Sequence, residues 1–129
     1  MKTGLPVLGM ILGVAATLPP YISPFGHLNL QQRVEVADHV IPGLIVLLVS
    51  LAALMLLPRH PPPQPPLLAG GGIITLAGFW MVATHIGLLT QAHQNIVPAG
   101  PLAWHLLPSL AVLLLGATWT ATLHPLRHH

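Results

Sequence analysis

The sequence of 129 residues contains no cysteine. Disulfide bonds, thiolate metal sites and cysteine nucleophiles are therefore excluded. Charged side chains are nearly as scarce, because four basic and two acidic residues make up only 5% of the chain. A soluble domain carries about a quarter charged residues, so six charges cannot cover a water-soluble globule of this length. A net charge of +2 that rests on four basic residues predicts no nucleic-acid partner.

Apolar side chains dominate what is present. They form 53% of the chain, and the mean hydropathy is +0.78. Membrane lipid is therefore the expected surrounding of most of the surface, and inside lipid only helices or a closed barrel satisfy every backbone polar group. The apolar runs, such as residues 40–57, are continuous, whereas barrel strands of about ten residues alternate apolar and polar positions. The sequence predicts an all-α, polytopic transmembrane helix bundle.

Four spans are expected within a single domain, residues 1–129. Their approximate limits are residues 4–22, 40–57, 67–91 and 101–123. The first apolar run is short for a span, since crossing the hydrocarbon takes about 20 residues. Lys2, the apolar core and the small residues 14–16 also fit a secretory signal peptide covering residues 1–18. Both interpretations of this segment stay open at the level of the sequence.

Several residues mark the ends of the predicted spans. Asp38 is expected to cap the second span, with Pro42 in its first turn. Residues 58–66 hold six prolines in nine positions and predict a stiff polyproline II connector. Trp104 and Trp119 fall near opposite boundaries of the last span and predict an aromatic belt.

The basic residues predict the orientation, because short cytoplasmic loops are enriched in lysine and arginine. Lys2, Arg59 and Arg127 fall on one side of a chain with four spans, and only Arg33 falls on the other. Both termini are therefore predicted to be cytoplasmic.

Three of the nine histidines gather near one depth on the outer side of this topology. At about 1.5 Å per residue, His85 and His105 lie roughly 9–10 Å from the centres of neighbouring antiparallel spans. His39 begins the second span on the same side. Small residues at helical spacing from each histidine predict that these faces point inward, since small side chains let membrane helices approach closely.

An ionisable side chain at membrane depth is a functional hypothesis by default. Neutral imidazole is a common ligand of zinc, copper, nickel and haem iron. The sequence therefore predicts a small, non-enzymatic membrane protein whose outer histidine cluster binds a metal ion or a b-type haem. The cofactor ligands expected are His39, His85 and His105. The weaker candidates for a metal are His93, Asp38 and Glu35.

Other interpretations remain open. The bundle is expected to form a homo-oligomer or to join a larger membrane-protein partner. In one alternative the chain is an accessory or structural subunit of a larger membrane complex, and the histidines serve packing alone. A transport component for metal or protons is a further alternative. No H-E-x-x-H motif occurs, and the H-x-x-x-H spacing at His124 and His128 contains Pro125, which disfavours a helical clamp. The two final histidines are either native or the remnant of a tag.

Overall fold

The structure is a computed structural model that describes residues 3–18, 36–59 and 62–123. Within these ranges every regular element is helical, and no strand is present. The elements are α1 (Gly4–Thr17), the π-helix η1 (Val36–Val40), α3 (Ile41–Leu56), α4 (Gln64–Thr84), α5 (Ile86–His93) and α6 (Ala99–Leu123). The predicted all-α class is confirmed.

Three helical stretches are long and apolar enough to cross a membrane. They are Val36–Leu56, Gln64–His93 and Ala99–Leu123, with 21, 30 and 25 residues. The first helix, α1, has 14 residues. At 1.5 Å per residue it extends over about 21 Å, less than the hydrocarbon thickness of about 30 Å. By length and composition, the described residues thus hold three candidate spans, as in a multi-pass membrane protein.

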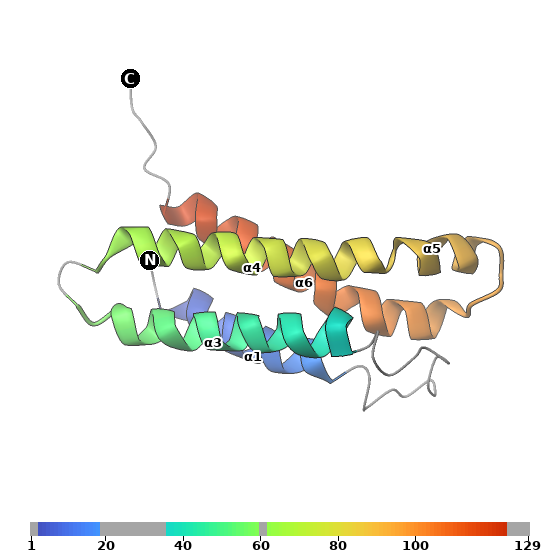
Figure 1. Ribbon diagram of the computed structural model, residues 1–129, viewed down its shortest axis with the longest axis horizontal. Coiled ribbons are helices and arrows are strands. Elements are labelled where there is room, and N and C mark those ends of the chain that lie inside the picture. The colour runs from blue at the N-terminus through green and yellow to red at the C-terminus, as the bar shows by residue number, and fades with distance from the viewer. Residues whose placement is uncertain (1–2, 19–35, 60–61, 124–129) are drawn as a thin grey trace, which may run out of the picture.

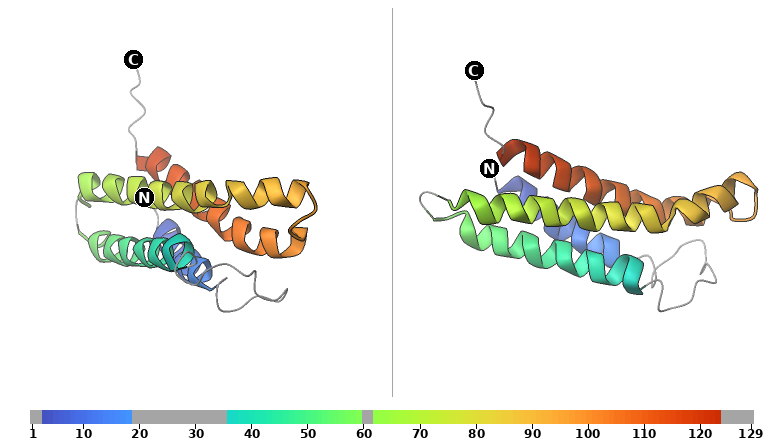
Figure 2. Two further views of the ribbon diagram at one scale, coloured as in Figure 1. Left: turned by 45° about the vertical axis from the view of Figure 1, so that its right-hand side comes forward. Right: turned by 45° about the horizontal axis from the view of Figure 1, so that its top comes forward.

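The helices pack as two pairs. Helix α1 lies against α3, and α4 lies against α6; the pairs meet where α3 contacts α4 and α1 contacts α6. Figure 1 shows α3 and α4 side by side along the length of the molecule. In both views of Figure 2, α5 and the beginning of α6 extend beyond the end of α3.

Glycines bring the backbones of α4 and α6 together. A Cβ atom on Gly78 would fall 2.5 Å from the Cα atom of Leu113, and one on Gly116 would meet the backbone of Thr75. Because lipid supplies no hydrophobic drive between helices, this close van der Waals contact stabilises the pair. The predicted inward stripes are confirmed, since all their members are buried: Gly71, Gly78, His85, His105, Ser109 and Gly116.

Glycines also bring the backbones of α1 and α3 together. A Cβ atom on Gly13 would lie 2.7 Å from the backbone nitrogen of Leu47 and 2.9 Å from the carbonyl oxygen of Gly43. On the opposite faces, large apolar side chains point outward. Those more than 60% exposed on the three long helices are Leu48, Met55, Leu76, Phe79, Leu107 and Leu114. Such faces suit lipid, where an apolar surface needs no cover.

Several boundaries differ from the sequence prediction. Helix α4 begins at Gln64, so Pro65 and Pro66 belong to its first turn and the predicted 58–66 connector ends earlier. Proline is tolerated there because the N–H groups of a first turn have no helical partner. Residues 60–61 lie outside the described residues. Helix α1 ends at Thr17, and residues 19–22 of the predicted first span also lie outside the description.

The start of the second span also differs. The prediction that Asp38 caps this helix is wrong, because Asp38 lies inside η1 and the residue before α3 is Val40. The π-helical turn extends the helix on the N-terminal side of α3, so Asp38 does not stand at a free helix end that it could cap. Pro42 does lie in the first turn of α3, as expected.

Trp119 lies in the interior, so the prediction that it belongs to an aromatic belt is wrong. Its side chain is 0% exposed, and its indole N–H donates to the carbonyl oxygen of Leu67 across 2.9 Å. A buried tryptophan requires such an acceptor, and the pairing of α4 with α6 supplies it. The interaction ties the first turns of α4 to the last turns of α6.

Replacing Trp119 by phenylalanine should therefore lower the free energy of unfolding by about 1 kcal/mol, the usual net worth of one hydrogen bond. The matched control is Trp80→Phe, since Trp80 is 54% exposed on the outer face. Denaturant unfolding in detergent, followed by circular dichroism, measures both. Equal stability of the two variants would contradict a role for the indole hydrogen bond.

Candidate metal centre

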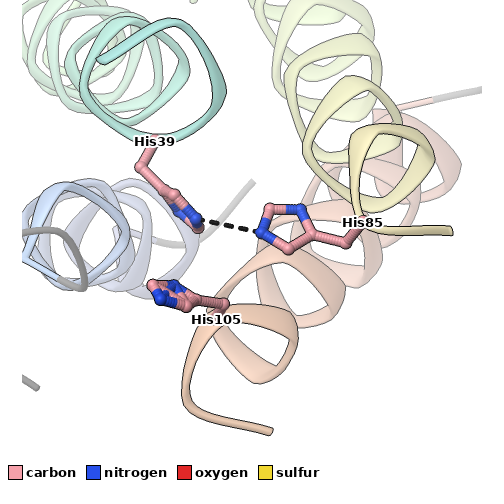
Figure 3. Close-up of side chains that lie close together, drawn as sticks. All are labelled: His39, His85 and His105. Carbon is pink, nitrogen blue, oxygen red and sulfur yellow. Dashed lines mark hydrogen bonds between the residues drawn. The ribbon is translucent and has the colours of Figure 1, made fainter. Parts of the chain in front are cut away.

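Three histidine side chains from separate parts of the chain point toward one another (Figure 3). His39 comes from η1, His85 from the junction of α4 and α5, and His105 from α6. Their side chains are 1%, 2% and 2% exposed. The ring centroid of His39 lies 4.9 Å from that of His85 and 5.0 Å from that of His105, and the last pair is 6.0 Å apart. The predicted convergence of His85 and His105 is confirmed.

Each of the three histidines lies at or near an irregularity in its helix. His39 belongs to the π-helical turn. His85 ends α4 and precedes α5 with φ −92° and ψ 0°, outside ideal helical geometry. His105 lies three residues before Pro108, which interrupts the hydrogen bonds of α6 because it has no N–H. Single π-helical turns occur often at functional sites, so these irregularities favour a site over simple packing.

The tautomer of His85 follows from its partners. Its Nδ1 atom contacts the carbonyl oxygen of Met81, one turn earlier in α4. A carbonyl oxygen only accepts, so Nδ1 carries the proton, and in the neutral ring Nε2 then carries a lone pair. This Nε2 lies 3.1 Å from Nε2 of His39. The His85 lone pair therefore points into the centre of the three rings.

His39 completes this interaction by donating its Nε2 proton to His85. Its Nδ1 atom is then a bare acceptor, and it is buried with no hydrogen-bond partner among the described residues. The Nδ1 atom of His105 is also buried and without a partner in the described part of the chain.

Buried polar atoms without partners are uncommon, and each costs about 1–3 kcal/mol. Two of them in one cluster of three histidines need an explanation. An ion that binds the cluster supplies one, because it rearranges which nitrogens carry protons and which carry lone pairs.

The spacing of the donor atoms suits one shared ion. One nitrogen from each histidine can be chosen so that all three lie within 4.8 Å of one another. Metal–nitrogen bonds of about 2.0–2.1 Å place ligand nitrogens about 3.3 Å apart in a tetrahedral site. The pair of His39 and His85 already has this spacing, and the widest separation exceeds it by only about 1.5 Å. Small rotations of the side chains close such a difference.

The weaker candidates from the sequence lie elsewhere. Asp38 is half-buried beside His39 but is not part of the group of converging donors. His93 is exposed at the end of α5, eight residues and about 12 Å beyond His85. Glu35 lies outside the described residues. Metal binding by these three side chains stays a prediction.

The sequence did not point to the groups that orient the histidines. The carbonyl of Met81 holds His85, and the hydroxyl of Thr84 donates to the same carbonyl across 3.0 Å. The break after Thr84 divides a stretch predicted as one continuous helix. Gly87, two residues beyond His85, was the one available signal, since glycine weakens a helix interior.

Comparison with known protein families, with curated proteins and with solved structures gave no match for this chain.

Proposed function

We propose that this chain is a membrane protein that binds one transition-metal ion through His39, His85 and His105. The observation that carries the proposal is the fixed tautomer of His85, which directs an Nε2 lone pair at two other buried imidazoles. A histidine that donates its second N–H to a backbone carbonyl has the usual orientation of a metal ligand. Packing alone requires neither this orientation nor a third converging ring.

Binding requires one change in the cluster. The Nε2 proton of His39 must leave that atom, so that Nε2 can offer its lone pair to the ion. In the alternative tautomer the proton lies on Nδ1, the atom that is buried without a partner among the described residues. Loading the site thus replaces the buried bare acceptor at Nδ1 of His39 with an N–H group. This supports a cluster that binds an ion over one that is complete as it stands.

The geometry favours an ion over a b-type haem. A haem held by two histidines places its macrocycle between the two rings, with their nitrogens about 4 Å apart across the iron. Here the Nε2 atoms of His39 and His85 are 3.1 Å apart and in direct contact. His105 lies against both rings, at centroid distances of 5.0 and 6.0 Å, where a macrocycle would have to pass.

We place α1 in the membrane as a fourth, short span. Its inner face packs on α3 and α6, while Val7, Leu8, Ile11 and Val14 are 44–60% exposed and suit lipid. With four spans, Arg59 lies on the side opposite the histidines. The cluster then belongs to the outer half of the membrane.

Metal analysis of the detergent-purified protein tests the proposal. After incubation with zinc or copper and removal of the excess, we expect one ion per chain. His93→Ala is the matched control, because His93 lies outside the cluster, and it should bind the same amount. An absorption spectrum of the protein as purified tests the alternative. A Soret band with no bound ion would select haem, and a chain that binds neither would contradict the proposal.

A further inference from the structure

The charge of the bound ion is constrained by its ligands. Each neutral imidazole contributes no charge, so the three histidines leave the whole charge of the ion uncompensated. All three are at most 2% exposed and lie within helices that suit the membrane. The free energy of desolvation of an ion grows with the square of its charge. For a divalent ion this cost is therefore about four times that for a monovalent ion of equal size. A site built only from imidazoles therefore disfavours a bare divalent ion.

One carboxylate lies close enough to act on this charge. Asp38 directly precedes His39 in η1 and is half-buried. It is the only acidic residue in the described part of the chain, and the sequence contains just one other, Glu35. A single negative charge beside the cluster neutralises a single positive charge. It leaves half of a divalent charge uncompensated.

The number of donors gives an independent constraint. The converging group consists of three nitrogens, and among the described residues no cysteine, aspartate, glutamate or further histidine joins it. Zinc sites are almost always four-coordinate, so zinc here would need an added water or anion. The monovalent ion of copper accepts three nitrogen ligands without a fourth. Imidazole is also a good ligand for copper, whereas magnesium and calcium require oxygen donors.

We infer that the three histidines hold monovalent copper, Cu(I), and that Asp38 compensates its charge from beside the site. This inference rests on the proposed metal-binding function and specifies the ion. Asp38 acts through its charge and not as a ligand, which agrees with its place outside the group of converging donors.

The test compares ions and variants on the full-length protein in detergent. The probes are Cu(I) kept reduced with ascorbate under nitrogen, Ag(I) as a redox-inert monovalent ion, and Zn(II). Competition with a chelator of known affinity gives each dissociation constant. We expect one Cu(I) or Ag(I) per chain, with Cu(I) bound at least about a hundredfold more tightly than Zn(II). A preference for Cu(I) over Zn(II) of less than about a hundredfold would contradict the inference.

Asp38→Asn removes the charge and keeps the size of the side chain, and it should weaken Cu(I) binding about ten- to a hundredfold. Asp38→Glu keeps the charge and should restore most of the affinity, whereas a merely structural role would respond to both. If Zn(II) binds as tightly as Cu(I), or if Asp38→Asn leaves the Cu(I) affinity unchanged, the inference is wrong while the metal site stands. If no ion binds, both the inference and the proposed metal-binding function are wrong.

Discussion

The variant His85→Ala is expected to bind the metal at least about a hundredfold more weakly than the native protein. His85 supplies the one lone pair whose direction is set by a backbone carbonyl, and loss even of an orienting partner around a metal costs about ten- to a hundredfold in affinity. With only His39 and His105 left, the ion also loses one of its three nitrogen donors. Titration with Cu(I) or Zn(II) against a chelator measures the change.

The same variant also affects the metal-free protein, so its fold must be measured separately. Alanine leaves Nε2 of His39 without its partner, at a cost of about 1–3 kcal/mol. Circular dichroism should still show a helical protein, and His93→Ala serves as the control for both readings. A helical His85→Ala protein that keeps the native affinity would contradict the proposed ligand set.

Leucine at position 78 should destabilise the protein by about 3 kcal/mol, the upper part of the range for overpacked sites. Beyond Cβ, the new side chain would enter the backbone of Leu113, which a Cβ atom alone already meets at 2.5 Å from Cα. Helices α4 and α6 would have to separate, and this displaces His85 and His105 as well. Both the unfolding free energy in detergent and the metal affinity should therefore fall.

Gly72→Leu is the matched control for this change. Gly72 lies six residues earlier in the same helix, and a Cβ atom there has no heavy atom within 4 Å. Leucine also has the higher helix propensity, by nearly 1 kcal/mol, so this variant should be as stable as the native protein or slightly more. Equal losses in the two variants would show that the close approach of α4 and α6 is not what stabilises the pair.

The helical class was predictable because it follows from composition. A chain with six charges requires lipid around it, and lipid requires helices when apolar runs are long. The convergence of His85 and His105 was also predictable, since both offsets were counted along regular antiparallel helices. Their burial followed from the small residues Gly78 and Ser109 at helical spacing on the same faces.

The details of the site were not predictable in the same way. No local residue pattern predicts the π-helical turn at His39, and Gly87 is the one sequence signal near the break at His85. The sequence of Pro65 and Pro66 is compatible with the end of a connector or with the first turn of a helix. In the structure both belong to the first turn of α4. The hydrogen bond from His85 to Met81 could not be predicted, since a sequence does not show which ring nitrogen faces which carbonyl.

The glycine contacts also bear on how an ion reaches the histidines and leaves them. Beyond the cluster, the backbones touch at Gly78 and Leu113 in one helix pair and at Gly13 and Leu47 in the other. In the described part of the chain, these contacts leave no space between the two backbones of either helix pair. An ion bound at His39, His85 and His105 would therefore find no passage between α4 and α6 or between α1 and α3 at these contacts.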